Sequence, residues 1–582
     1  MKNYLRKVLG VLNKKEKSRL IYFSFCSLLN ATLEFLSLGL LIPLIASIVG
    51  TSNGNIFLNF NFFNFLENHS TEEKLVIVLL IISCVYFFKN LFIAIFLWIS
   101  QNILKRIRIR ILNSLFEGYT QEELAENLNS HTSAKIRNIQ IAVYSFSKNL
   151  RELMQLIIEI LVVIFLLIFL IVLEPLAAIV TLLSLVLMTG LFYLLIKKKT
   201  TQWGVKAFNL KAKTIKMFVE SLSLFKEIKI NGKEIFFLNK FAISQEKLGR
   251  VDVLQNFFQS IPRYYIELFS ILSTALFSFI LIYKGLNITE IAPILIAYVA
   301  AGLRLIPSFN RILGSLQLFR YHLPAVDMMF DEISRFKKDT SFSNKGNLKQ
   351  KNFKHNNIDC IFEIKNLSFK YPGSQKFVLE DINFTVEQAD LIGLKGKTGS
   401  GKSTLLNLIL GLYKPSNGQI NFCGSNINKN LKSWYSNIGY VAQEINLLDE
   451  SIKNNICLGL EDKEINIEKL NYVVNICKLD NFINSLENGL NTSVGELGKK
   501  ISGGQKQRIG IARALYTSPK ILILDEATNA LDEKTEKEIL YNLKEIQKEM
   551  NMTILMISHN SSIDMCDKIY NIDNNKLKLI NE

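Results

Sequence analysis

A glycine-rich loop occupies residues 396–404, where the sequence reads Gly396-Lys397-Thr398-Gly399-Ser400-Gly401-Lys402-Ser403-Thr404. The first eight of these residues have the spacing G-x-x-x-x-G-K-S. In such a loop, consecutive backbone N–H groups converge on phosphate oxygens, and the lysine adds a positive charge near the β and γ phosphates. The hydroxyl of Ser403 can ligate Mg²⁺. The loop therefore predicts a site for a nucleoside triphosphate, ATP, with Mg²⁺ as its metal ion.

The flanking sequence supplies the secondary structure that this loop requires. Residues 391–394 form an apolar run that predicts a buried strand entering the loop, and residues 404–409 predict the helix that leaves it. A second apolar strand is expected at 521–524, and it ends in Asp525 and Glu526. Asp525 can hold Mg²⁺ through a water molecule, and Glu526 can orient or deprotonate an attacking water.

The two halves of the chain differ in composition. The chain has 582 residues, too many for one ordinary domain, and its apolar residues are concentrated before residue 320. The net charge of +17 is compatible with nucleic-acid binding or with a membrane protein whose basic residues crowd its cytoplasmic loops. We favour the membrane protein, because the sequence has no nucleic-acid motif, and expect no nucleic-acid partner.

Apolar stretches long enough to cross a bilayer predict six spans. They lie at about 21–49, 75–100, 153–173, 176–196, 257–283 and 288–318. Glu174-Pro175 separates the third span from the fourth, so these two should form a tight helical hairpin. Before the first span, residues 1–20 are rich in lysine and arginine, which predicts a basic amphipathic helix along the cytoplasmic face of the membrane.

The distribution of lysine and arginine predicts the orientation of the spans. Roughly seven precede the first span, about eight follow the second and about thirteen follow the fourth, against one or two in each opposite loop. Both termini are therefore expected in the cytoplasm, where ATP is found. The long inward segments, about 101–152 and 197–256, predict helices that continue below the membrane. Their turning points, near 118–132 and 222–233, are expected to be short segments presented to the nucleotide domain.

Several ionisable residues interrupt the apolar spans: Glu34, Lys89, Glu159, Arg263, Glu267, Arg304 and Arg311. Each charge at the bilayer centre costs about 2.5–3.5 kcal/mol on insertion scales, so such residues usually face a bundle interior or a watery cavity. One hypothesis is a basic cavity for an anionic substrate, formed by Lys89, Arg263, Arg304 and Arg311. The alternative is internal ion pairing in which Glu34 and Glu267 neutralise arginine partners.

A polar segment without periodicity separates the apolar half from the nucleotide half. The boundaries predicted are a transmembrane domain at 1–335, a linker at 336–357 and a nucleotide-binding domain at 358–582. The fold class predicted is an all-α domain of six transmembrane helices followed by an α/β phosphate-loop NTPase domain. A half-buried strand at 362–369 delivers Tyr371, whose ring could stack on adenine.

A second motif lies at 501–505, where the sequence reads Ile501-Ser502-Gly503-Gly504-Gln505. With this motif, the phosphate loop and the six apolar stretches, the chain resembles the ATP-binding-cassette (ABC) transporters of the exporter type. The second motif is similar to the family signature, with isoleucine in place of the usual leucine. The resemblance implies that Gln443 lies in the loop linking nucleotide state to the membrane half, where it serves Mg²⁺ with Ser403 and Asp525. It also implies that Tyr371 stacks on adenine, that Asp532 lies in the D-loop, and that His559 contacts the γ-phosphate.

The same resemblance implies a dimer. In this family each ATP is held between the phosphate loop of one cassette and the signature serine of the other, and this chain has one of each. Because Lys402, Ser502, Glu526 and His559 are all present, a homodimer would have two complete sites. A heterodimer with a degenerate partner stays open at this point.

A narrower resemblance concerns the substrate. The segments 261–267 and 304–311, together with Lys89, are similar to segments of bacterial lipid-linked oligosaccharide flippases of the PglK kind. That similarity implies outward movement of an anionic lipid-linked substrate across the inner membrane, in contact with membrane lipid. A multidrug or lipid A exporter is the alternative within transport. An ATP-gated channel or a regulatory ABC protein is the alternative from another class.

Overall fold

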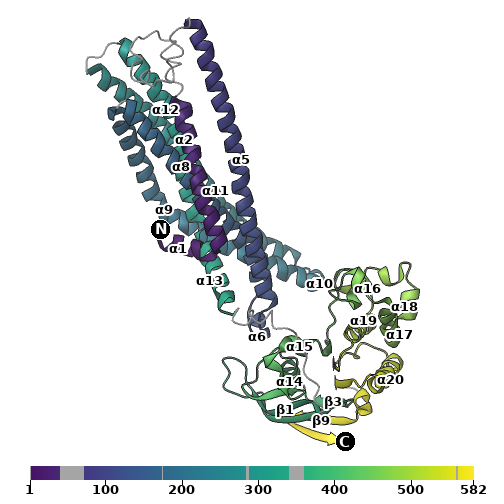
Figure 1. Cartoon of the computed structure of the whole chain (residues 1–582). Helices are drawn as coiled ribbons and strands as arrows, with labels where there is room; N and C mark the ends of the chain where they lie inside the picture. The colour runs from purple at the N-terminus through teal and green to yellow at the C-terminus, as the bar shows by residue number, and fades with distance from the viewer. Residues whose placement is uncertain are drawn as a thin grey trace. The chain divides into compact units, whose positions relative to one another are not determined.

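The computed structural model describes residues 2–39, 71–173, 175–283, 288–339, 360–558 and 561–581. The chain divides into two compact units, with the main division between residues 344 and 345. The first unit is helical, and the second combines sheets with shorter helices (Figure 1). The units are described separately below.

Six helices of 26 residues or more form the body of the first unit, counted over its described residues. The helices of this unit are α1 (Lys2–Val11), α2 (Lys14–Gly39), α5 (Thr71–Thr120), α6 (Leu124–Asn129), α7 (Thr132–Arg137), the π-helix η2 (Asn138–Ala142), α8 (Val143–Leu173), α9 (Pro175–Ser223), α10 (Phe225–Ile230), α11 (Glu234–Tyr283), α12 (Ile288–Tyr321) and α13 (Leu323–Asp339). The predicted fold class is confirmed: each of the six predicted spans lies on one of the long helices α2, α5, α8, α9, α11 and α12. The first span is described only as far as residue 39.

Four stretches among the described residues are long and apolar enough to cross a membrane: Lys14–Ser37, Leu79–Thr120, Thr132–Ile171 and Glu234–Tyr283. The predicted hairpin at Pro175 is also present, since α8 ends at Leu173 and α9 begins at Pro175. Proline is well placed there, because the first residue of a helix needs no N–H partner.

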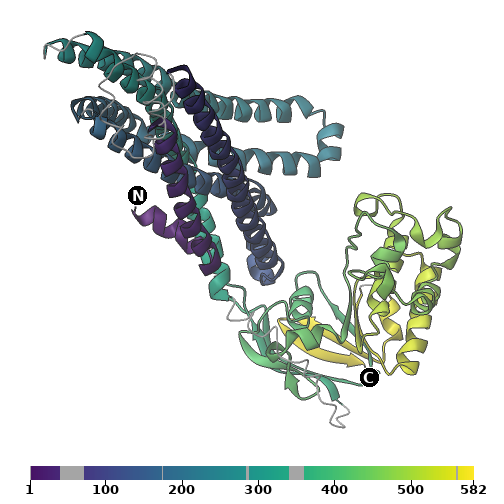
Figure 2. The same ribbon diagram turned by 45° about the horizontal axis from the view of Figure 1, so that its top comes forward.

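The long helices extend well beyond a bilayer core. Helices α5 and α11 each have 50 residues, which at about 1.5 Å per residue is far more than the roughly 30 Å of hydrocarbon. Helices α9 and α11 lie side by side and are joined by α10 (Figures 1 and 2). Each turning point expected from the sequence contains a short helix: α6 lies within 118–132 and α10 lies within 222–233.

The N-terminal helix packs against other helices of the same unit. Helix α1 forms, but its apolar residues Val8 and Val11 are buried in a cluster with residues of α5, α8 and α13. An ion pair of 2.6 Å between Lys7 Nζ and Asp327 Oδ1 adds to the contact with α13. The helix expected before the first span is therefore present, and protein covers part of its apolar face; its position along the membrane surface stays a prediction.

The predicted linker begins later than expected. Helix α13 continues to Asp339, so residues 336–339 are helical. Apolar side chains of α13, among them Val326, Met329 and Ile333, are buried against the rest of the unit, which is why the helix persists. Residues 340–357 of the expected linker lie outside the described residues.

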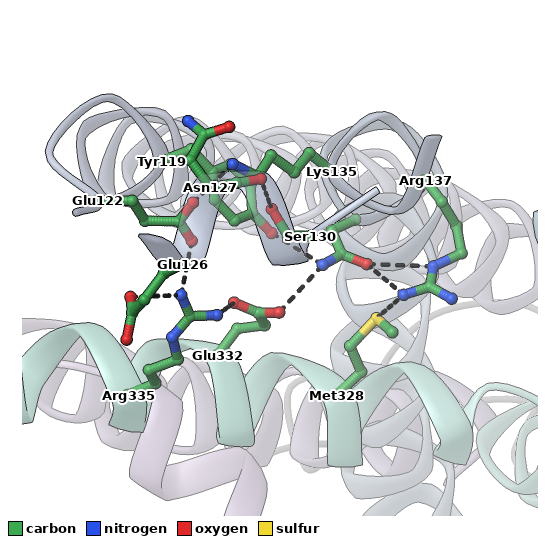
Figure 3. A network of polar contacts seen from close by, with 11 residues as sticks. Tyr119, Glu122, Glu126, Asn127, Ser130, Lys135, Arg137, Met328, Glu332 and Arg335 are labelled. Atoms are coloured by element: carbon green, nitrogen blue, oxygen red, sulfur yellow. Dashed lines mark hydrogen bonds and ion pairs between the residues drawn. The ribbon is translucent and has the colours of Figure 1, made fainter. Parts of the chain in front are cut away.

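A polar network ties α13 to the α5–α7 region (Figure 3). The carboxylate of Glu122, whose side chain is 2% exposed, pairs with Lys135 Nζ at 2.5 Å and with Arg335 Nη2 at 2.7 Å. Arg335 also pairs with Glu126 at 3.0 Å, and Asn138 donates to Glu332 at 3.2 Å. Arg335 of α13 thus pairs with acidic groups of a segment that lies more than 200 residues earlier in the sequence.

Replacing Arg335 with glutamine is expected to lower the free energy of unfolding by about 1 kcal/mol, because Lys135 still compensates the buried Glu122. Thermal unfolding of the purified chain in detergent measures this. The matched control is Lys216→Gln, which removes an ion pair with Glu220 that is about half exposed on both sides. Equal unfolding temperatures for the two variants would contradict a stabilising role for the network.

The second unit contains two sheets, a four-stranded antiparallel one with order β2-β1-β4-β5 and a six-stranded one with order β10-β9-β3-β8-β7-β6. The strands are β1 (Cys360–Phe369), β2 (Leu379–Glu387), β3 (Leu391–Gly396), β4 (Asn417–Phe422), β5 (Ser425–Asn426), β6 (Ile438–Val441), β7 (Ile521–Asp525), β8 (Thr553–Ile557), β9 (Lys568–Asp573) and β10 (Lys576–Asn581). Strands β6, β7, β8, β3 and β9 run parallel, and β10 is antiparallel to β9. The buried strands expected at 391–394 and 521–524 are β3 and β7.

The helices of this unit are α14 (Lys402–Ile409), α15 (Leu431–Tyr435), α16 (Ile452–Ile456), α17 (Ile467–Ile476), α18 (Asp480–Asn484), α19 (Gly503–Tyr516) and α20 (Glu533–Glu549). One buried cluster joins α14 to the strands of both sheets, and its centre includes Trp434, whose Nε1 donates to Ile409 O at 2.9 Å. A second cluster joins α16, α17, α19 and α20. The loop after β3 and the end of β7 are therefore held on a packed scaffold.

Candidate functional site: a phosphate loop facing two carboxylates

The glycine-rich loop joins β3 to α14, as its sequence predicts. Gly401 has φ 103°, a left-handed value that favours glycine. A Cβ atom at Gly396 would lie 2.6 Å from Ser400 Oγ and 2.9 Å from Ile572 O, so the loop has no room for a side chain there. These two glycines let the backbone form a tight cradle at the start of α14.

Lys402 is held at the inner side of this loop. Its Nζ donates to Gly396 O at 2.6 Å and to Lys397 O at 3.1 Å. Burial lowers the pKa of the Lys402 ammonium, and the nearby carboxylates of Glu526 and Asp525 oppose that shift. The ammonium is thus fixed at the loop while the residue stays largely buried.

The loop fits the phosphates of a nucleotide. Among the described residues, Ser400 Oγ is buried without a hydrogen-bond partner, which leaves a polar atom of the loop free for a ligand. Ser403 is exposed and Thr404 is buried, both in the first turn of α14, where helix N–H groups favour an anion. The donor set of Ser403, Asp525 and Gln443 consists of oxygen ligands, which suits Mg²⁺.

Two carboxylates lie at the end of β7. Strand β8 separates β3 from β7, and all three are parallel, so their carboxyl ends share the sheet edge that carries the phosphate loop. Burial raises the pKa of Asp525, and the neighbouring charge of Glu526 raises it further. Tyr440 donates its hydroxyl to Asp525 Oδ2 at 3.4 Å, and burial raises the pKa of this tyrosine to about 12.

Glu526 receives two amide hydrogen bonds on the same oxygen. Gln443 Nε2 donates to Glu526 Oε2 at 2.8 Å, and Asn529 Nδ2 donates to it at 2.9 Å. The family resemblance implies that Gln443 serves Mg²⁺. Because its Nε2 atom donates to Glu526, its Oε1 atom is the one suited to the metal ion. The contact from Asn529 was not predicted from the sequence.

Tyr371 lies beside the phosphate loop. Its hydroxyl shares a hydrogen bond of 2.9 Å with Thr404 Oγ1, and its ring makes edge contacts with Phe369 and Tyr413. The side chain is 40% exposed, so its ring has a free part. An aromatic surface next to the phosphate loop is compatible with the predicted stacking on adenine.

The signature residues begin α19 and do not join the phosphate loop by any hydrogen bond among the described residues. Ser502 caps α19, accepting from Gln505 N, while Gln505 Oε1 accepts from Ser502 N. Asp532 similarly caps α20 by accepting from Thr535 N at 3.0 Å, and these hydrogen bonds lower its pKa. Ser502 is exposed and able to meet a ligand from outside its own chain. His559 lies outside the described residues.

Three of the four predicted cavity residues lie in ion pairs. Lys89 Nζ and Arg304 Nε lie 3.4 and 2.5 Å from the carboxylate of Glu34. Arg311 Nε lies 2.5 Å from Glu159 Oε1. Arg263 is exposed on α11. Internal ion pairing, the alternative to a basic cavity, therefore describes these three residues. The second carboxylate is Glu159, which pairs with Arg311, and not Glu267 as expected.

Residues 379–529 match the family model described as ABC transporter. The chain contains an ABC transporter domain. This match covers the phosphate loop, the signature motif and both carboxylates.

The chain also has the fold of an ABC exporter. A solved structure of a bacterial Atm1-family ABC exporter with ATP bound aligns over 97% of this chain and 95% of that one, with a TM-score of 0.76 and 20% sequence identity. At that identity the likeness concerns the fold alone.

Curated relatives match over somewhat more than a third of this chain. The toxin RTX-III translocation ATP-binding protein of Actinobacillus pleuropneumoniae is 41% identical over 207 residues, which is 35% of this chain and 29% of the relative. The ATP-dependent lipid A-core flippase of Vibrio parahaemolyticus is 40% identical over 212 residues, 36% of each chain. The alpha-hemolysin translocation ATP-binding protein HlyB of Escherichia coli is 40% identical over 223 residues, 38% of this chain and 31% of the relative. The chain thus spans about a third of the length of these relatives.

Proposed function

We propose that this chain is one half of an ATP-driven exporter. The observation that carries the proposal is the convergence of a phosphate loop, a buried lysine and the Asp525-Glu526 pair in one unit, joined to a unit of long apolar helices. Lys402 would hold phosphate oxygens, and Ser403, Asp525 and Gln443 would hold Mg²⁺. Bound Mg²⁺ neutralises charge on the phosphates. Glu526 would take the proton of the attacking water.

The proposed assembly is a homodimer. One chain supplies one phosphate loop and one exposed signature serine, Ser502, so each complete site needs residues of two chains. Tyr371, Asp532 and His559 keep the roles implied by the family resemblance: adenine stacking, the D-loop contact and contact with the γ-phosphate. The proposed location is the bacterial inner membrane, with several crossings and both termini in the cytoplasm, as the lysine and arginine distribution predicts.

The proposed substrate is an amphipathic anionic lipid, in particular a lipid-linked oligosaccharide moved outward by alternating access. Arg263 supports an anionic substrate best, because it lies in a predicted span, is exposed, and has no ion pair among the described residues. The second candidate is a multidrug or lipid A exporter, favoured by the match to a lipid A-core flippase. The candidates differ in the charge and headgroup of the molecule that is moved.

Arg263→Ala is expected to reduce ATP-dependent flipping about ten-fold or more, since a hydrogen bond to a charged group is worth about 1.5–3 kcal/mol. The measurement is movement of labelled lipid-linked oligosaccharide in proteoliposomes, with basal ATPase measured in parallel. The matched control on the same helix is Arg250→Ala, whose exposed side chain pairs with Glu246.

Several outcomes would count against the proposed substrate or function. Equal flipping by the two variants would contradict the role of Arg263. Stimulation of ATPase by neutral or cationic amphiphiles, but not by polyprenyl pyrophosphates, would favour the second candidate. If ATP lets the substrate equilibrate across the membrane but never accumulate on one side, the protein is a gated channel and not a pump.

A further inference from the structure

Tyr371 lies in an exposed loop, so its own backbone fixes its ring only weakly. The loop, residues 370–376, lies between β1 and β2 outside regular helix or strand, and all of its residues are exposed. Segments with few buried contacts have low local stability. The position of the Tyr371 ring therefore depends on the contacts of its side chain.

One of these contacts is made at the start of α14. The hydroxyl of Tyr371 shares a hydrogen bond of 2.9 Å with Oγ1 of Thr404, a residue that is 5% exposed. Thr404 lies in the first turn of α14, the helix that leaves the phosphate loop. The far end of the Tyr371 side chain is thus tied to that helix.

The second contact is made by Tyr413, which follows the other end of α14. Its N–H donates to Asn407 O at 3.2 Å, which ties it to the last turn of the helix. Its ring stacks on Phe369 with centroids 5.2 Å apart and meets the ring of Tyr371 with centroids 5.9 Å apart. Tyr413 and Phe369 are 6% and 5% exposed and belong to the buried cluster around α14. Tyr371 thus lies against rings that are themselves fixed.

Part of the Tyr371 side chain stays accessible to a planar base. Neither neighbouring ring is parallel to it, since the interplanar angles are 80° with Phe369 and 89° with Tyr413. In the part of the chain that the structure describes, no ring stacks face to face on Tyr371, and the residue is 40% exposed. Aromatic rings favour offset stacking, so a base can pack on this ring while the ring keeps both of its neighbours.

We propose that Tyr413 and Thr404 are positioning residues for the nucleotide: from the two ends of α14 they hold the ring of Tyr371 at a fixed place beside the phosphate loop. This inference rests on the proposed function, in which Tyr371 stacks on adenine. The loop holds the phosphates and Tyr371 holds the base, so a fixed spacing between them lets one nucleotide use both. A binding group that is already ordered loses less freedom when its ligand binds, which raises affinity.

The test measures, by calorimetric titration of the purified full-length chain, the binding of ADP and of inorganic tripolyphosphate, which has no base. Tyr413→Leu keeps an apolar side chain but removes the ring, and it is expected to weaken ADP binding about two- to ten-fold, the value of one aromatic pair. Its affinity for tripolyphosphate is expected to be unchanged, because the phosphate loop is intact. Tyr413→Phe keeps the ring, and the control Tyr541→Leu removes an exposed ring from α20; both are expected to bind the two probes like wild type.

Two further variants distinguish positioning from simple structural support. Tyr371→Ala removes the stacking ring, and adding Tyr413→Leu to it is expected to cause no further loss of ADP affinity, because both changes act through the same ring. Tyr371→Phe removes only the hydrogen bond to Thr404 and is expected to weaken ADP binding about two- to ten-fold, with tripolyphosphate binding unchanged. This variant tests the other end of α14 even if Tyr413→Leu fails to fold.

The inference is overturned if Tyr413→Leu weakens both probes equally, or if the losses in the double variant add, because either result would mean general damage to the site. Wild-type affinity for ADP in Tyr413→Leu or in Tyr371→Phe would also overturn it. The proposed function fails separately: a wild-type chain that binds neither ADP nor tripolyphosphate has no nucleotide site, whatever Tyr413 does.

Discussion

The variant Glu526→Gln is expected to bind ATP normally while its turnover falls by about 10²–10⁴-fold, the usual contribution of a general base. Glutamine keeps the size and the acceptor oxygen of glutamate, so the hydrogen bonds from Gln443 and Asn529 can persist. It cannot take a proton from water. The loop and Lys402, which contact phosphate, are unchanged, so binding should survive.

Two measurements check this prediction: ATPase turnover of the reconstituted chain, and equilibrium binding of a fluorescent ATP analogue. The matched control is Glu533→Gln, which neutralises an exposed carboxylate near the same turn, one that pairs with Lys537 at 2.6 Å. The control is expected to keep full turnover. Turnover in Glu526→Gln within a few-fold of wild type would remove Glu526 from the proposed role.

Features that are local in sequence could be predicted well. The phosphate loop, the strands β3 and β7 and the break at Pro175 each depend on a few adjacent residues. The apolar runs that predict six spans are also local, and the structure has a long helix at each. Short-range chemistry of this kind needs no knowledge of which segments meet.

Features that depend on distant contacts could not be predicted to the same extent. Nothing in the sequence shows that Gln443 reaches Glu526 across 83 residues, or that Asn529 reaches the same oxygen. For α1, amphipathic periodicity shows that one face is apolar but not whether protein or lipid covers it. For the charged residues in the spans, the sequence left both a cavity and ion pairing open, and only the fold brings Glu34 of α2 to Lys89 of α5 and Arg304 of α12.

Neutralising Glu34 is expected to destabilise the membrane half strongly. Its carboxylate lies 3.4 Å from Lys89 Nζ and 2.5 Å from Arg304 Nε, and the side chains of Glu34 and Lys89 are only 6% and 7% exposed. Removing one partner of a buried pair leaves an uncompensated charge and costs about 3–5 kcal/mol. Glu34→Gln should therefore unfold at a clearly lower temperature or denaturant concentration in detergent micelles.

The same variant separates the two hypotheses for these basic residues. If Lys89 and Arg304 serve mainly to neutralise Glu34, the double variant Glu34→Gln with Lys89→Met should recover much of the lost stability, since it leaves one cation, partly exposed Arg304, in place of two. Glu246→Gln, which breaks a largely exposed pair with Arg250, provides the control and should unfold like wild type. Wild-type stability in Glu34→Gln would instead mean that both cations are solvated without their carboxylate. They would then have to face a watery cavity. Lys89 and Arg304 would in that case join Arg263 as residues proposed to contact the anionic lipid.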